Sequence, residues 1–385
     1  MYMLQRVINL LKNVNTSIRT YVLCLILSDG RKNCAAMARS VGISAKPLYD
    51  YLSKATANSK EIEAILLDYA NKSWIKGVKR TVVIDPTSII KRYAYKIEKL
   101  CYDKAGCTKH VEHTTVPVYA SVVDKNIKIP LSLDFWIQKK IVGKKRYKSK
   151  IKIAQELIKY LKDKGLKFDF VSLDGAFPAP DMFAFFKKYR LKFIMRISKS
   201  RCVKINGKRA QLKFQRALKL ARNSREKTVQ AELYGDQYFF TAKKRQCKNG
   251  EWETVFLVSN MNISAKEQVA DFDLRWPQEK INRTTKQKFG SNQCQAIKAS
   301  KQQAHILATF FAHSIIELAK NDKQKQSVDS AVNFIRKFHF NDLAKLIATS
   351  KKDKNRQSID PTAIYFQNHI QNSSNYIEKY SSLSP

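Results

Sequence analysis

Apolar side chains recur at near-helical spacing through the first 75 residues of the chain. They fall at Val7, Leu10, Leu11, Ile18, Val22, Leu25 and Leu27. This spacing gathers them on one face of successive helices, and Asp29-Gly30 is a turn signal after the last of them. The pattern predicts a helical region over residues 1–75.

A short helix, a glycine turn and a second amphipathic helix are predicted within that region. Residues 35–44 carry the first helix and the turn at Gly42, and Ser44 is a candidate N-cap for the second. The apolar side of the second helix consists of Leu48, Tyr49 and Leu52. This order is typical of a helix-turn-helix, in which we expect Arg39 and Lys46 to bind DNA. An ordinary helical hairpin has the same pattern and is the alternative.

From Lys79 onward the pattern changes to short apolar runs, and two of these runs end in an acid. One run ends at Asp85 and the other, over 168–175, contains Asp174. The elements predicted around them are a hairpin over 116–123 and 127–136, a helix over 149–163, a helix over 179–189 and a strand over 191–197. Strands that alternate with helices predict an α/β fold with a mixed sheet flanked by helices.

Residues 200–260 favour antiparallel strands, because Asn206-Gly207 and Asn249-Gly250 are hairpin turn signals. The strands are predicted at 203–205, 228–242 and 252–259, and helices follow at 264–273, 277–289 and 298–320. The chain therefore divides into a helical region over 1–75, an α/β core over 76–320 with an inserted β-subdomain over 199–262, and a basic helical tail over 321–385.

The charge of the chain is strongly unbalanced. It has 72 Lys and Arg against 32 Asp and Glu, a formal net charge of +40 over 385 residues. Basic residues distributed through segments with a regular apolar pattern favour a folded protein that binds nucleic acid, since neutralised phosphates release counterions. A surface whose charge serves solubility alone is the alternative.

Composition also limits where the protein works. The longest apolar run, over 21–27, is far shorter than the ~20 residues that a membrane-spanning helix needs. The seven cysteines are scattered and include no C-x-x-C pair, which suits a reducing compartment rather than a disulfide framework. We therefore expect a cytoplasmic protein that does not enter a membrane.

The two acids that end apolar runs, Asp85 and Asp174, are candidates for chemistry. Ligands of α/β sheets bind where strands end. A single aspartate after a strand is often a turn residue or a helix cap, so this pair alone is a weak signal.

The most specific pattern in the chain consists of Phe272, Arg275, Glu279 and Lys286. It resembles the signature Y-(2)-R-(3)-E-(6)-K that DDE transposases of bacterial insertion sequences carry around their third catalytic acid. Every spacing matches, and Phe272 stands in place of the tyrosine. Trp276 and residues 286–290 also look like this group.

The spacing has a physical meaning apart from the family. Pro277 fits the first position of a helix, so Glu279 falls in the first turn, where the helix dipole favours a carboxylate. Lys286 then lies about two turns along the same face. An acid flanked by Arg275 and Lys286 suits a metal site that must also hold phosphates.

The resemblance implies a ribonuclease H-like fold with an inserted antiparallel β-subdomain. In that fold the first acid lies on the first strand, the second on the fourth strand and the third on a following helix, and Asp85, Asp174 and Glu279 fill these places. Three carboxylates are hard oxygen ligands that suit two Mg²⁺ or Mn²⁺ ions in phosphodiester chemistry.

The resemblance also implies a function. A DDE transposase cuts DNA at the terminal inverted repeats of its transposon, joins the freed 3′-hydroxyl to target DNA, and acts as a homodimer on double-stranded DNA in the bacterial cytoplasm, at the nucleoid. We expect Arg275, Lys286 and Trp276 to contact the transposon end. The alternative is a domesticated, catalytically inactive descendant that only binds DNA.

Two further groups of residues are weaker candidates. Trp252, in the predicted β-subdomain, could stack on a displaced base as in relatives of this family, although a buried tryptophan in the sheet is the simpler interpretation. Cys101, Cys107, His110 and His113 have the spacing C-x5-C-x2-H-x2-H, which fits no standard zinc finger. We interpret their segment as a basic loop that faces DNA.

Overall fold

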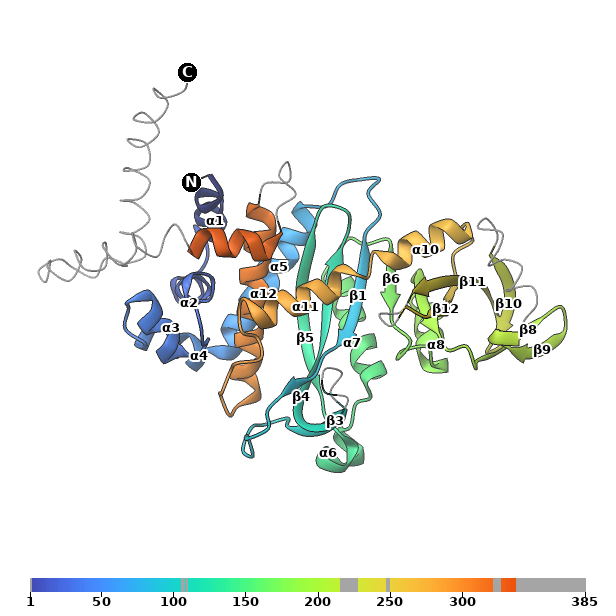
Figure 1. Cartoon of the computed structure of the whole chain (residues 1–385), viewed down its shortest axis with the longest axis horizontal. Helices are drawn as coiled ribbons and strands as arrows, with labels where there is room; N and C mark the ends of the chain where they lie inside the picture. Colours follow the sequence, from blue (N-terminus) through green and yellow to red (C-terminus); the bar gives the residue numbers. More distant parts are fainter. Residues whose placement is uncertain are drawn as a thin grey trace, which may run out of the picture. The chain divides into compact units, whose positions relative to one another are not determined.

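The computed structural model, drawn in Figure 1, describes residues 2–104, 108, 110–214, 228–246, 250–320 and 327–336. Packing divides the chain into two units. The helical unit consists of Met1–Leu66, Lys96–Glu98 and Ile281–Pro385, and the sheet unit of Leu67–Tyr95 and Lys99–Lys280. Of the tail predicted over 321–385, all but 327–336 lies outside the described residues.

The helical unit is built around one long buried helix. Its helices are α1 (Tyr2–Leu11), α2 (Thr16–Leu27), α3 (Cys34–Val41), α4 (Lys46–Ser53), most of α5 (Ala55–Lys72), the end of α11 (Pro277–Gln287), α12 (Ala299–Ala319) and a helix over 328–336. α12 packs against α1, α2 and α4, where the Tyr21 hydroxyl and His305 Nδ1 lie 2.8 Å apart. Packing therefore groups α12 with the N-terminal helices, although the sequence pattern grouped it with the α/β core.

The two helices predicted on either side of Gly42 are present as α3 and α4. α3 ends at Gly42, whose φ of 77° is the left-handed conformation that favours glycine. The N-cap of α4 is Ala45, so the prediction of Ser44 was wrong; the Ser44 hydroxyl instead accepts a hydrogen bond from the Lys46 amide, at 3.3 Å. Tyr49, predicted on the apolar side of this helix, is 55% exposed.

The sheet unit contains a mixed sheet with helices on both faces. Its strands are β1 (Thr81–Pro86), β2 (Ile89–Ile90), β3 (Cys101–Lys104), β4 (Val111–Val123), β5 (Lys128–Trp136), β6 (Phe170–Leu173), β7 (Phe193–Ile197), β8 (Cys202–Ile205), β9 (Lys208–Gln211), β10 (Val229–Leu233), β11 (Asp236–Gln246) and β12 (Trp252–Ser259). Its helices are α6 (Lys139–Arg146), α7 (Lys150–Asp163), α8 (Pro180–Lys188), the 3-10 turn η1 (Leu212–Phe214), α10 (Ala265–Asp273) and the start of α11.

The order of the strands puts β1 and β6 near the middle of the sheet. The path runs β4-β1-β6-β7-β12-β11-β10-β8-β9, and β2, β3 and β5 pair with β4. β1, β6 and β7 are parallel, while β4 and β12 flank them in the opposite direction. This mixed sheet, with Asp85 near the end of β1 and Asp174 directly after β6, is compatible with the expected ribonuclease H-like fold.

Alternate side chains of β6 and β7 face different helices. Phe193 stacks on Phe186 of α8, with ring centroids 4.6 Å apart. On the other face Phe170 and Ile194 form a core cluster with Phe272 of α10. α7 packs on β1, β4 and β5. The two inner strands are therefore covered on both sides, as strands with continuous apolar runs require.

Residues 200–260, where they are described, form antiparallel strands that continue the same sheet through the pairing of β12 with β7. Asn206 and Gly207 make the predicted turn, with φ of 49° and 79°. The single strand predicted over 228–242 is instead two, because Tyr234 and Gly235 adopt φ of 55° and 84° and reverse the chain. A tyrosine in a left-handed conformation is rare, so this turn has little signal in the amino-acid sequence.

A buried ion pair fixes the start of β1. Arg80 is fully buried and its Nε donates to Asp124 Oδ2 at 2.8 Å, while its other nitrogens donate to the carbonyl oxygens of Ala70 and Ser73. Asp124 Oδ1 accepts from the Ile127 amide at 2.9 Å. Arg80 thus joins α5, β1 and the turn between β4 and β5, and the strand that leads to Asp85 is held at its beginning.

Replacing Asp124 with Ala should therefore destabilise the sheet unit. The change leaves the Arg80 guanidinium buried without its counter-charge, a loss of about 3–5 kcal/mol in the free energy of unfolding. Denaturant unfolding measures it. The matched control is Lys125→Ala in the same turn, where the side chain is exposed and the change should be within about 0.5 kcal/mol. Equal effects of the two changes would contradict this role of the pair.

A buried lysine holds the segment that follows α11 in the helical unit. Gly290 has a φ of 68°, and a Cβ at this position would collide with the Lys32 side chain. The Lys32 Nζ donates to the Ser28 carbonyl at the end of α2, and its amide donates to Gln293 Oε1 at 2.7 Å. Burial, with Arg336 nearby, lowers the pKa of Lys32 to about 7.

This pKa predicts a dependence of stability on pH with a defined sign. Between about pH 7 and the ordinary lysine pKa of 10.5 the unfolded chain binds one proton more than the folded chain at Lys32, so the free energy of unfolding rises with pH. We expect Lys32 to contribute a rise of about 5 kcal/mol over this window. The measurement is the difference in denaturant unfolding between wild type and Lys32→Met, because burial raises the pKa of the Cys24 and Cys34 thiols and their contributions have the opposite sign. This difference should grow with pH, whereas the exposed control Lys54→Met should follow the wild type. A difference that stays constant across the window would contradict the prediction.

Candidate active site

Asp85 and Asp174 lie side by side in the sheet unit. β1 and β6 are parallel neighbours with Ile84 opposite Leu173. The residue that follows each of these two in the chain is one of the acids. Adjacent strands lie about 4.8 Å apart. Residues separated by 89 positions are therefore neighbours at the carboxyl edge of the sheet, and both are half-buried.

The two carboxylates are directed to the same face. Side chains alternate along a strand, so Asp174 shares a face with Phe170 of β6, and the register gives Asp85 the same side. That is the face on which Phe272 of α10 packs. α11 begins four residues after α10 ends, so the segment that carries Glu279 follows directly from the helix that covers this face.

One oxygen of Asp174 lacks a partner. Oδ1 is buried and accepts no hydrogen bond from any described residue. A buried carboxylate oxygen without a donor costs free energy, and a bound cation would remove this cost. Two adjacent, half-buried carboxylates of this kind are hard oxygen ligands, and they fit a divalent metal ion.

Glu279 occupies the predicted place at the start of a helix. α11 begins at Pro277, which confirms the predicted first residue, and Glu279 lies in its first turn. Its side chain is 54% exposed, and Oε1 lies 3.9 Å from an Arg275 nitrogen. Across the described part of the chain no three His, Cys, Asp or Glu side chains are grouped closely enough to hold a metal ion; the two aspartates form a pair, and Glu279 points to Arg275.

Arg275 is a buried cation at the same helix start. It is 8% exposed, and its guanidinium lies 5.5 Å from the centre of the Phe272 ring. Its Nε is buried and donates to no acceptor among the described residues. The long contact with Glu279 is a weak ion pair, so this guanidinium is placed to bind a further anion.

Phe272 serves as a buried aromatic ring, a role that needs no hydroxyl. Its ring is 6% exposed and packs with Phe170, Ile194, Val255 and Leu257. The position contributes apolar burial that holds α10, and with it the start of α11, against the sheet. An aromatic ring serves this role without a phenol oxygen.

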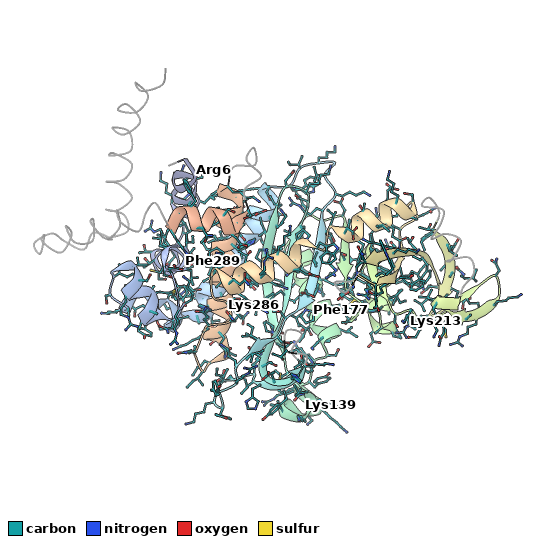
Figure 2. The ribbon with its side chains drawn as sticks, viewed as in Figure 1. Arg6, Lys139, Phe177, Lys213, Lys286 and Phe289 are labelled. Carbon is teal, nitrogen blue, oxygen red and sulfur yellow. The ribbon has the colours of Figure 1, made fainter. Side chains whose placement is uncertain are left out.

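The other predicted DNA contacts are on the surface or partly buried. Trp276 is 42% exposed. Lys286, half-buried in the last turn of α11, belongs to the helical unit, as do Arg39 and Lys46, which are exposed on α3 and at the start of α4. Figure 2 labels Lys286 and, directly beyond its helix, Phe289.

Trp252 lies at the same sheet edge as the two aspartates. β12 is antiparallel to β7 with Phe256 opposite Ile197, so its first residue extends past the end of β7, where β1 and β6 also end. The side chain is 66% exposed. The interpretation of Trp252 as a buried sheet residue was therefore wrong, and a planar ring is available to a ligand.

The sequence analysis did not identify a polar pocket next to Asp174. A pocket of about 310 Å³ is lined by Gly175, Arg196, Ser198, Lys199, Glu253 and Phe256, among others. Arg196 contacts Glu253 at 2.9 Å, and Arg245 contacts the other oxygen of the same carboxylate at 3.0 Å. An arginine inside the apolar run 191–197 was the available signal.

The cysteine and histidine candidates are not arranged as a metal site. Cys101 pairs with Thr114 in the β3–β4 hairpin, and the His113 ring instead packs against Tyr102, with centroids 4.2 Å apart. Cys107 lies outside the described residues.

Comparison with protein families gives two overlapping matches. Residues 9–217, more than half of the chain, match the family described as "DDE superfamily endonuclease". Residues 138–315 match the family described as "Transposase DDE domain". The first match includes Asp85 and Asp174, and the second includes Asp174, Glu279 and Lys286. No curated protein matches the chain. In the described part of the chain no helix is both long and apolar enough to cross a membrane.

Proposed function

The chain belongs to the DDE superfamily endonucleases, and we propose that it is a transposase, which cuts DNA at transposon ends and joins the freed ends to target DNA. The observation that carries this proposal is the pairing of β1 with β6, which sets Asp85 beside Asp174 at one sheet edge. Both acids fall inside a matched DDE region, and the signature residues follow in the second.

Asp85, Asp174 and Glu279 are the residues that we propose to hold two Mg²⁺ or Mn²⁺ ions. The unpartnered Oδ1 of Asp174 supports this assignment, as does the exposed Glu279 carboxylate, which is only weakly paired and free to take another rotamer. When bound, the ions supply the Lewis acidity that activates a water or a 3′-hydroxyl and stabilises the leaving oxygen. The protein contributes the aspartate pair and, before α11, the buried Arg275 cation.

Arg275 is the residue that we propose to position the phosphate backbone. Its guanidinium is already desolvated and has an unused N–H, so little ordering is needed when a phosphate oxygen binds. Lys286, about 10 Å from Glu279 along the axis of α11, suits a neighbouring phosphate. Trp276 and Trp252 present exposed rings to the DNA, and Arg39 and Lys46 serve the N-terminal contact with the duplex.

The functional partners follow from this assignment. We infer double-stranded DNA, both transposon inverted repeats and target, as the substrate, and a homodimer in the complex that brings two ends together. The net charge of +40 supports a polyanionic partner.

Asp174→Asn should abolish metal-dependent cleavage of linear DNA that carries the transposon ends, while binding of the ends stays equal or becomes tighter. The change removes a metal ligand and also removes a negative charge near phosphate. Cleavage on denaturing gels and gel shifts at matched salt give the two readings. The exposed Asp181 nearby is the matched control, and Asp181→Asn should cleave normally. Loss of binding in the Asp174 variant would assign that residue a structural role.

The wild type itself decides between the enzyme and its inactive alternative. A transposase cleaves these ends when Mg²⁺ or Mn²⁺ is added and stops when the ion is chelated. Tight binding of the ends without cleavage under either ion would favour the domesticated DNA-binding protein.

Arg275→Ala and Lys286→Ala should each weaken binding of the ends and lower the slope of log affinity against log salt by about one phosphate. Arg275→Lys should restore binding only in part, since an ammonium cannot make the paired hydrogen bonds of a guanidinium. The measurement is affinity over a salt series. Lys280→Ala, an exposed change of equal charge on α11, is the control. If all three alanine variants have the wild-type slope, Arg275 and Lys286 do not bind phosphates, and the pattern around Glu279 is a solvent-exposed helix face.

A further inference from the structure

We propose that α6, beside the β3–β4 hairpin, is a second binding surface for double-stranded DNA, which contacts backbone phosphates about 20 Å from the aspartate pair. The inference rests on the proposed function for its choice of partner. The surface is called the α6 arm here and consists of Lys139, Lys140, Lys144, Lys145 and Arg146.

The strand registers place the α6 arm at the same edge as the aspartates. Asp85 lies opposite Tyr119 of β4, and β4 extends past that level to His113, where β3 pairs with it. At about 3.4 Å per residue the six residues from Tyr119 to His113 span about 20 Å. β5 ends with Trp136 opposite Val116, so the chain leaves the sheet at this same edge and enters α6. Figure 1 shows α6 and β3 together at this end of β4.

The composition of α6 fits a ligand rather than a core. Five of its eight residues are basic, none is acidic, and the helix, described in full, buries no side chain. Gly143 interrupts it with φ 73° and ψ 165°, and Ile141 is 50% exposed. A segment that buries no side chain gains no packing energy from its helical form. Its position must therefore be determined by the contacts of the residues on either side of it.

Anchors lie on both sides of α6. Gln138, directly before it, donates through Nε2 to the Tyr102 carbonyl of β3. Lys150, shortly after it, contacts Asp103 at 3.0 Å and lies 4.3 Å from the centre of the Trp136 ring. Figure 2 labels Lys139 at the end of the sheet unit where the segment begins. The contacts of Gln138 and Lys150 hold both ends of the segment that carries the basic residues.

The positive charge of the α6 arm is not neutralised within the described part of the protein, where none of its five cations forms an ion pair. The acids of the adjacent hairpin are used elsewhere: Asp103 pairs with Lys150 and Glu112 with Arg92 at 2.9 Å. Five like charges in eight residues repel one another, and a row of phosphates offsets this repulsion.

Duplex DNA is the polyanion that the position favours. A span of about 20 Å corresponds to roughly six base pairs at 3.4 Å each, so a duplex whose cleaved bond lies at Asp85 and Asp174 and which runs along β4 passes the arm within one helical turn. The Tyr102 ring of β3 already has Lys140 Nζ over it, 5.7 Å from its centroid, and lysines and an arginine on an exposed segment suit phosphates rather than bases. Contact there is therefore independent of sequence.

The test compares two triple variants that remove equal charge from opposite edges of the sheet. The first is Lys144→Ala, Lys145→Ala and Arg146→Ala. The control is Lys125→Ala, Lys164→Ala and Lys167→Ala, exposed residues at the edge where β1 and β6 begin. Affinity of the full-length protein for a fluorescent duplex of about 40 base pairs and for its single strand is measured over a salt series in EDTA, so that neither cleavage nor metal enters.

The α6 variant should lower the salt slope for the duplex by about two to three and weaken binding more than tenfold, because each lost phosphate contact contributes about 0.9 to the slope. The control should change the slope by less than about one, and both variants should keep the wild-type melting temperature. Equal losses in both variants would mean that total charge alone matters, and an unchanged slope or a loss confined to the single strand would also overturn the proposal. Since no variant touches the carboxylates, an absence of cleavage activity would bear on the proposed function and not on this surface.

Discussion

The parallel pairing of β1 with β6 brings two carboxylates together, and the sheet unit is organised around the repulsion between them. It holds two half-buried carboxylates about one strand spacing apart at the sheet edge. Like charges at that distance repel each other more strongly as water is excluded, and one oxygen of Asp174 has no donor to relieve it in the described part of the chain. The register is fixed by buried apolar residues before each acid, Ile84 and Leu173 among them, so the acids cannot separate without loss of the core. A fold that maintains such a pair is suited to a cation.

The rest of the sheet unit supports this pair from both directions along the chain. At the amino end of β1 the buried Arg80–Asp124 pair fixes where the strand starts. At the carboxyl edge Arg196, Arg245 and Glu253 form a second charged group next to Asp174, in which one carboxylate is shared by two guanidinium groups. The edge thus carries negative charge at its centre and positive charge beside it, the distribution that a phosphodiester flanked by metal ions requires.

Much of this arrangement could be predicted from the sequence, for reasons that particular residues make clear. Asp85 and Asp174 were identifiable because buried strands of a parallel sheet are continuous apolar runs, and a carboxylate at the end of such a run is conspicuous. The start of α11 was predictable because Pro277 tolerates only the first positions of a helix. The register that sets Asp85 beside Asp174 was not predictable. The two acids are 89 residues apart, so the pairing of their strands depends on how α7 packs and not on any local pattern.

The features that the sequence did not indicate depend on tertiary context. Tyr234 adopts a left-handed conformation that its residue type disfavours, and the neighbouring strands hold it there. Trp252 is apolar and lies in a strand, which predicts burial. However, β12 extends beyond the end of β7, so the Trp252 ring is exposed to solvent. α12 follows the core in sequence, but its long apolar surface is matched by α1, α2 and α4. In each case the neighbouring strands or helices, rather than the residue type, determine the conformation, the exposure or the packing.

The contact between Arg275 and Glu279 gives the proposed site a physical logic that neither residue has alone. In the protein without ligand the guanidinium is buried and the nearest carboxylate oxygen is 3.9 Å away, a pair too loose to be a strong hydrogen bond. The contact still lowers the cost of the buried Arg275 cation. Under the proposed function, Glu279 would help to hold the metal ion and Arg275 would bind the phosphate, so each would exchange a weak partner for a stronger one. Neither charge would then lack a counter-charge before or after binding, which is a physical reason for an arginine four residues before a glutamate at such a site.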